Sequence, residues 1–293
     1  MRNGPEPVRL LHPGVKTVLL IAAGLVLIAG TQLFVFTDHT DQDFAWTIKA
    51  PIEAAFMGAA YYASFVLVVG GARQRYWSRA RVSLFSPMMF TFAMLIASLQ
   101  HLDAFHFNSP AFFPRFAAWA WMVVYVIVPA LEVVVLIIQL RAPGEDLPRV
   151  APMWGAMRAA LTIQGAIMLL LGAALFVAPA ATLGLWPWKL TLFTAQVTGG
   201  WLLGFGVAAI QVVIENDWTR VGAGCASYLL VGILELVAVA RYPRAIDWGA
   251  PAGWIYVAFL ACVVVTSAVA LYATTRPGGS AGKAEGVPSP APA

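Results

Sequence analysis

The chain has few charged side chains. Asp, Glu, Lys and Arg make up 11% of its 293 residues, whereas a soluble globular protein carries about 25%. At the same time 60% of the residues are hydrophobic, which is more apolar surface than one core can bury. The scarcity of charge therefore excludes a soluble globular protein, a disordered chain and a free nucleic-acid-binding protein. A polytopic membrane protein remains.

Cysteine pairs and nucleotide-binding motifs are also missing. Cys225 and Cys262 lie in different apolar runs without CxxC or Cys/His spacing, so neither a disulfide nor a zinc site is expected. The sequence has no Walker loop, dinucleotide fingerprint or GxSxG motif. The net charge of +4 comes without an RNA- or DNA-binding motif. We expect the lipid bilayer as a partner and no nucleic acid, and no motif identifies a cofactor.

Eight apolar runs are long enough to cross a bilayer, which takes about 20 residues. The first run is too long for the apolar region of a signal peptide, so we expect it to be retained as a helix. The sequence thus predicts an all-α integral membrane protein, an eight-helix bundle with spans at 16–36, 52–71, 82–101, 117–140, 159–180, 192–214, 222–240 and 253–272.

Basic residues in alternate loops set the orientation of these spans. With the N-terminus inside, 13 of the 18 Lys and Arg residues fall on the cytoplasmic side. The positive-inside rule therefore predicts that both termini are cytoplasmic. The bias toward Ala, Val, Gly and Arg adds the expectation of a bacterial protein in the cytoplasmic (inner) membrane. The basic residues expected outside are Lys49, Arg115, Lys189, Arg241 and Arg244.

A proline-rich linker divides the chain into two groups of four spans. We expect a first four-helix repeat at 1–140, a cytoplasmic linker at 141–158 and a second four-helix repeat at 159–273. The segment 274–293 is rich in Pro, Gly, Ala and Ser, which predicts a disordered cytoplasmic tail.

Landmarks recur between the two halves at matching spacing. Trp46 and Trp188 each precede a glycine by 12 residues, and tryptophan-containing turns at 77–79 and 218–220 follow further along. We interpret these matches as an internal duplication. Because each repeat has an even number of spans, the halves would be parallel, related by an axis along the membrane normal.

The second span of each half is rich in small residues. Ala55, Ala59 and Ala63 recur every four residues, and Gly200 and Gly204 form a GxxxG motif. Small residues at this spacing let helix backbones approach closely. We therefore expect both spans in the interior of the bundle.

Two acidic residues lie within the predicted spans, where each costs about 2.5–3.5 kcal/mol at a helix centre. Glu132 follows Pro129 in the inner half of the fourth span, and Glu235 lies in the outer third of the seventh. These acids either carry protons or cations along a path or hold the bundle together through hydrogen bonds. Glu53, at the mouth of the second span, is expected to be an ordinary boundary residue close to water.

Histidine and aspartate gather in the first two outer loops. His39 and Asp43 lie in the first loop, and His101, Asp103 and His106 lie in the second. Imidazole and carboxylate together suit zinc, manganese or iron, but the spacing differs from the HExxH pattern. A metal- or substrate-binding site and a solvated polar network both remain open, and no metal ligand is assigned.

Three functions fit these features. The first is a small secondary transporter or permease for a small molecule or ion, with a path between the repeats and a cavity touching Glu132 or Glu235. The second is a membrane-embedded metal- or haem-binding redox protein or enzyme, which requires the outer His and Asp side chains to converge. The third is a non-catalytic accessory subunit, a dry bundle with each glutamate capped by a neighbour. The transporter is favoured, and no catalytic residue is assigned.

Overall fold

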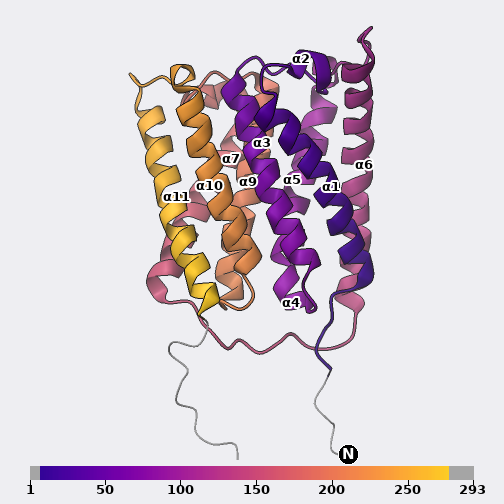
Figure 1. Ribbon diagram of the computed structural model, residues 1–293, viewed down its shortest axis with the longest axis vertical. Helices are drawn as coiled ribbons and strands as arrows, with labels where there is room; N and C mark the ends of the chain where they lie inside the picture. Colours follow the sequence, from indigo (N-terminus) through magenta and orange to yellow (C-terminus); the bar gives the residue numbers. More distant parts are fainter. Residues whose placement is uncertain (1–6, 277–293) are drawn as a thin grey trace, which may run out of the picture.

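The computed structural model describes residues 7–276 and is a bundle of helices (Figure 1). Eight of these helices are long and apolar enough to cross a membrane, which confirms the predicted all-helical, multi-pass membrane architecture. They are α1 (Pro13–Val35), α3 (Pro51–Ala72), α5 (Val82–Gln100), α6 (Phe112–Arg141), α7 (Gly155–Val177), α9 (Leu192–Glu215), α10 (Gly222–Arg241) and α11 (Pro251–Thr275).

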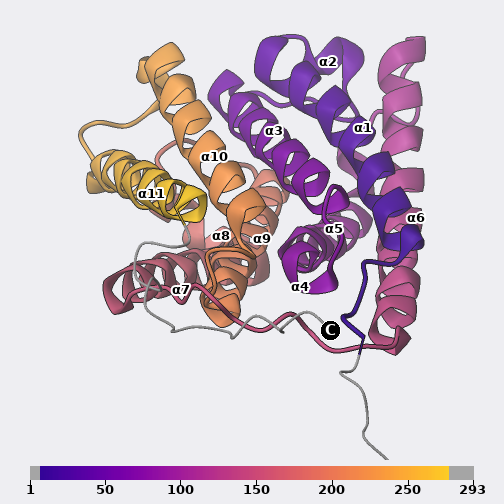
Figure 2. The same cartoon turned by 60° about the horizontal axis from the view of Figure 1, so that its bottom comes forward.

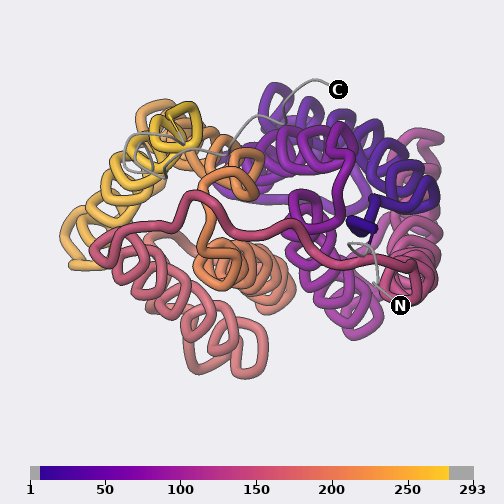
Figure 3. The backbone as a smooth tube through the Cα atoms, turned by 90° about the horizontal axis from the view of Figure 1, so that it is seen from below, coloured from indigo at the N-terminus to yellow at the C-terminus, as the bar shows by residue number. Residues whose placement is uncertain are grey.

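Short helical turns occupy the loops at the two ends of the bundle. We call the end where α1 begins and α11 ends the terminal face, and the opposite end, which carries α2, the loop face (Figure 1). The linker between α6 and α7 runs across the terminal face (Figure 3). The short elements are α2 (Thr40–Asp43), α4 (Trp77–Ala80), α8 (Pro179–Thr182) and the 3-10 turns Leu102–Ala104, Leu183–Leu185 and Pro243–Ala245.

Local sequence explains where several helices begin and end. Proline occupies the first turn of α1, α3 and α11, where its missing N–H needs no partner. A capping box between Thr191 and Thr194 starts α9, and Asn216, in the left-handed conformation with φ of 46°, ends it. The predicted tail at 274–293 lies outside the described residues from 277 onward, and its first two residues belong to α11.

The second helix of each half lies in the interior, as predicted, and most of α3 and α9 is buried. Helix α3 packs between α1 and α10, and α9 packs between α7 and α5 (Figure 2). Helix α10 also contacts α11, and α5 contacts α6. Thus α10 of the second half packs on α3 of the first half, and α5 of the first half packs on α9 of the second half.

Glycines make these close contacts between backbones. A Cβ atom on Gly58 would lie 2.4 Å from the backbone nitrogen of Phe34 in α1, and one on Gly199 would lie 2.9 Å from that of Phe176 in α7. The GxxxG glycines face α5, where a Cβ on Gly200 would lie 3.2 Å from Ala93. Gly199 therefore lies at a close approach of α9 to α7.

Candidate functional site

Two cavities lie among the spanning helices. One, the α6 cavity, has a volume of about 420 Å³ and is lined by α1, α3, α5 and α6, with α9 and α10 behind them. The other, the α11 cavity, has a volume of about 440 Å³ and is lined by α7, α9, α10 and α11, with Phe56 of α3. Each cavity lies largely within one half of the chain.

Glu132 lies in the wall of the α6 cavity and is only 3% exposed. The hydroxyl of Thr91 in α5 donates a hydrogen bond of 2.6 Å to its Oε2 atom. The Oε1 atom has no hydrogen bond within residues 7–276. Pro129 and Pro87 interrupt the hydrogen bonding of α6 and α5 near this site. The carboxyl group therefore has an oxygen available for a ligand.

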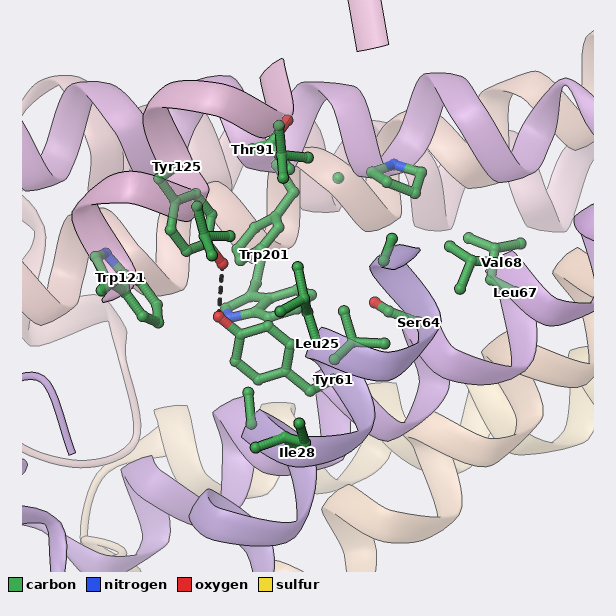
Figure 4. A pocket seen from close by; sticks show the side chains of 18 of the residues that line it. Leu25, Ile28, Tyr61, Ser64, Leu67, Val68, Thr91, Trp121, Tyr125 and Trp201 are labelled. Carbon is green, nitrogen blue, oxygen red and sulfur yellow. Dashed lines mark hydrogen bonds between the residues drawn. The ribbon is translucent and has the colours of Figure 1, made fainter. Parts of the chain in front are cut away.

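Aromatic side chains form much of the rest of this cavity (Figure 4). The hydroxyls of Tyr61 and Tyr125 are 2.7 Å apart and hydrogen-bond to each other. The ring of Trp201 stacks on Phe90 with centroids 3.6 Å apart, and Trp121 packs against Tyr125 at 4.4 Å. The two tyrosines thus satisfy each other and leave a single hydroxyl proton for a further partner.

Glu235 of α10 lies in the wall of the α11 cavity, where it is 2% exposed. Its Oε2 atom accepts a hydrogen bond of 3.0 Å from the hydroxyl of Tyr256. Its Oε1 atom is buried and has no hydrogen-bond partner within the described part of the chain. Trp186 and Trp188 pack on the Tyr256 ring with centroids 5.4 and 5.5 Å away.

The two cavities share part of a wall. Phe205 of α9 and Tyr228 of α10 line both of them, with ring centroids 6.3 Å apart in an edge-to-face arrangement. The Tyr228 hydroxyl donates to the sulfur of Met168 at 3.1 Å, which fixes the ring. An aromatic partition therefore separates the cavity of Glu132 from that of Glu235.

No protein-family model, curated protein or solved structure matches this chain.

The expectation that Glu53 is a boundary residue close to water is wrong. The side chain is 3% exposed, lies beside the Thr194 hydroxyl and leaves its Oε1 atom without a hydrogen bond within residues 7–276. The loop before α3 is itself buried at Trp46 and Ile48, so the entry to this span does not lie in water. A position at the mouth of a span in the sequence therefore does not mean that the side chain is exposed to water.

The two histidines of the second outer loop, His101 and His106, each have hydrogen-bonding partners within the protein. His101 Nε2 lies 2.9 Å from Oε1 of Gln196. His106 Nδ1 lies 3.0 Å from the Phe44 carbonyl oxygen, and its Nε2 lies 3.0 Å from the Thr47 hydroxyl. Both ring nitrogens of His106 are thus engaged within the protein.

The remaining residues of the outer cluster are more open to solvent. His39 and Asp103 are exposed, whereas Asp43 is half-buried and lines the loop-face end of the α6 cavity. Burial raises the pKa of Asp43 above its ordinary value, although Gln32 and His39 oppose the shift. Within the described residues no group of three or more His, Cys, Asp or Glu is arranged to hold a metal ion. Substrate or metal binding on this face stays a prediction.

A cluster of charged residues at the terminal face was not predicted from the sequence. Glu215, fully buried at the end of α9, accepts hydrogen bonds from Arg81 Nη2 at 2.9 Å, Arg220 Nη1 at 3.1 Å and Gln211 at 3.0 Å. Arg81 also pairs with Asp146 of the linker at 2.7 Å. Burial disfavours the Arg81 guanidinium, but the two carboxylates outweigh it and raise the pKa of Arg81 above its ordinary value.

Asp217 attaches the linker to this face. Its carboxylate accepts hydrogen bonds from the backbone N–H of Val150 at 2.5 Å and Ala151 at 3.3 Å, and from Thr219. Burial alone would raise the pKa of Asp217, but these donors outweigh it and lower the pKa below its ordinary value. The polar residues on either side of Trp218, at 215–217 and 219–220, directly follow a predicted span and were the signal of this cluster in the sequence.

Proposed function

We propose that the protein is a small secondary transporter, or permease, with a path between two four-helix repeats and Glu132 and Glu235 as the coupling acids. One observation carries the proposal: each acid lines an intramembrane cavity, and the cavities share the wall of Phe205 and Tyr228. Ionisable side chains that face a cavity at membrane depth commonly mark ion and substrate pathways.

The positions of the helices support two repeats in the chain. Helices α1 and α7 each have 23 residues and begin 142 positions apart, at Pro13 and Gly155. The 3-10 turns that begin at Leu102 and Pro243 are 141 positions apart and have equal length. An inserted or lost residue between the halves explains the change of offset by one.

Hydrogen bonds between the halves support the same interpretation. The Ser86 hydroxyl donates to the Gly204 carbonyl at 2.9 Å, and the Ser227 hydroxyl donates to the Ala63 carbonyl at 2.7 Å. Both donors and both acceptors are 141 positions apart, so each bond is the counterpart of the other. Such reciprocity is what parallel repeats about an axis along the membrane normal require.

The extent of the cavities supports a path across the bundle. The α6 cavity extends from Leu67 and Val68, near the terminal end of α3, to Asp43 at the loop face, and the α11 cavity includes Pro187 and Ala250 at the loop face. A solute that passed the aromatic partition would meet both acids. With cytoplasmic termini in a bacterial inner membrane, Glu132 would be the acid nearer the cytoplasm.

The experiment uses the full chain reconstituted into liposomes that contain a pH-sensitive dye. Organic cations, anions and neutral molecules are added in turn under an imposed pH gradient. We expect one class to collapse the gradient several-fold faster than in protein-free liposomes. We expect Glu132→Gln to abolish this effect and Glu145→Gln, on the exposed linker, to preserve it. A gradient unaffected by every class, with folded protein inserted, contradicts proton-coupled transport.

The capping of both glutamates favours a second candidate, a non-catalytic accessory subunit. Thr91 and Tyr256 each donate a hydrogen bond to one of the acids, as that function predicts. The same assay separates the candidates, because an accessory subunit moves no solute by itself and does not depend on Glu132.

A further inference from the structure

We infer that the α6 cavity binds a lipophilic organic cation, such as a quaternary ammonium or phosphonium ion, with Glu132 as its counter-ion. The inference rests on the proposed function, because it names the substrate class of that transporter. It is carried by four features of the cavity: the sign of its charge, its aromatic walls, its shortage of other polar groups and its exposed rim.

The charges in the cavity wall are all of one sign. Glu132 and Asp43 line it, and the lining contains no Lys, Arg or His. A carboxylate in an apolar environment is costly without a positive partner, and none is supplied by the described residues around Glu132. A bound cation would complete this pair, whereas an anion would be repelled by it.

The aromatic walls of the cavity suit the organic part of such a cation. Tyr61, Tyr125 and Trp201 come from three helices and present aromatic rings to the same space (Figure 4). A cation near the face of an aromatic ring is attracted by the ring quadrupole, and aromatic cages bind quaternary ammonium groups in this way. These rings therefore stabilise a diffuse positive charge.

Most of the other polar groups in the cavity already have partners, but the Trp201 indole N–H and the Asp43 Oδ1 atom have none within residues 7–276. Ser86 and Ser227 donate to backbone carbonyls, and the hydroxyls of Tyr61 and Tyr125 bond to each other. A sugar or a nucleotide needs many hydrogen-bond partners and would find few here. Glu132 Oε1 and, at the loop-face end, Asp43 Oδ1 remain as carboxylate contacts, which is what a cation without hydrogen-bond donors requires.

The rim of the cavity reaches the lipid-facing surface. Ile28 of α1 and Phe113 of α6 line the cavity and are 68% and 69% exposed. The edge between α1 and α6 therefore opens the cavity toward the bilayer. A lipophilic cation that dissolves in the membrane could enter from the side without crossing the loop face.

The direct test measures binding of tritiated tetraphenylphosphonium to the full chain in nanodiscs of neutral lipid, after subtraction of binding to empty nanodiscs. Tetraphenylborate is the matched probe, since it has the same shape and the opposite charge. We expect saturable binding of the cation at least tenfold tighter than that of the anion. We expect Glu132→Gln to weaken binding of the cation at least tenfold.

Two further variants keep the test independent of folding. Glu132→Asp retains the charge and should bind the cation within a few-fold of the original protein, and Glu145→Gln should bind it equally well. Equal binding of the two ions, or binding that Glu132→Gln leaves unchanged, overturns the inference and points to a site filled by lipid chains.

The outcomes also separate this inference from the proposed function. Glu132-dependent binding without flux in liposomes supports the ligand class and overturns transport. Proton-coupled flux of another class of solute, without binding of tetraphenylphosphonium, overturns the ligand class and supports transport.

Discussion

Two buried carboxylates in this protein have very different surroundings. Glu215, at the terminal face, is held by Arg81 and Arg220 in a cluster that occupies both of its oxygens. Glu132, in the α6 cavity, accepts a single hydrogen bond from the described residues, from Thr91. A carboxylate whose lone pairs are occupied has no capacity for a ligand, whereas one with an open oxygen in a cavity does. Burial alone therefore does not identify a functional acid, and its partners must be counted.

The largest effect on stability is expected for Glu215→Gln. The change leaves Arg81 and Arg220 without the charge that balances them, and breaking a buried ion pair costs about 3–5 kcal/mol. Equilibrium unfolding in mixed micelles measures this loss. The same change at Glu145, which is exposed, should alter stability by less than about 0.5 kcal/mol. Equal stability of the two variants would mean that the cluster does not hold the terminal face together.

A smaller loss is expected for Asp217→Asn, at about 1–3 kcal/mol, because the backbone N–H groups of Val150 and Ala151 lose a charged acceptor. The folded-state pKa of Asp217 is lowered. Its contribution is therefore complete above the unfolded pKa of about 3.9 and is lost as the pH falls through the lower folded value. Unfolding measured at neutral pH and near pH 3 should show the difference between variant and original shrinking in acid. A difference independent of pH would contradict this role.

An intermediate loss of stability is expected when Glu235, the acid of the α11 cavity, loses its hydrogen-bond donor. Tyr256→Phe removes the hydroxyl that donates to Glu235 and is expected to cost about 1 kcal/mol of stability. Tyr272→Phe on the same helix is the matched control, since this side chain is exposed, and should cost nearly nothing in the same unfolding assay. If the two changes cost the same, the bond to Glu235 contributes nothing to the fold.

The smallest effect on stability, and the largest on transport, is expected for Glu132→Gln. The glutamine keeps the shape of the side chain and can accept the Thr91 hydrogen bond through its amide oxygen. We expect stability to change by less than about 1 kcal/mol while proton-coupled flux is lost, with both measured on the same preparation. A loss of stability as large as that of Glu215→Gln would place Glu132 among the structural acids.

The spans were predictable because the bilayer fixes both their length and their hydropathy. The predicted span at 192–214 differs from α9 (Leu192–Glu215) by one residue. The largest difference is in α6, which begins at Phe112 and not at 117. Arg115 interrupts the apolar run there, but an arginine in the first turn of a helix at the loop face can remain in water.

The two candidate acids were also predictable, because a carboxylate stands out in an apolar run. Their surroundings were not. Phe205 and Tyr228 belong to different helices, and only packing brings them to one wall. Arg81 and Glu215 are separated by 134 positions, so no local sequence pattern predicts their contact. Residue type thus identified candidates, and long-range packing decided which of them is open to a ligand.

The packing of helices from one half on helices of the other half has a consequence for the synthesis of the chain. Helix α3 packs on α10, and α5 packs on α9. Helices α3 and α5 therefore leave the ribosome before the helices on which they pack have been synthesised. A nascent chain truncated in the linker would expose to lipid the small-residue face of α3 that the finished protein buries. Membrane proteases could therefore distinguish an incomplete chain from a complete one by that surface.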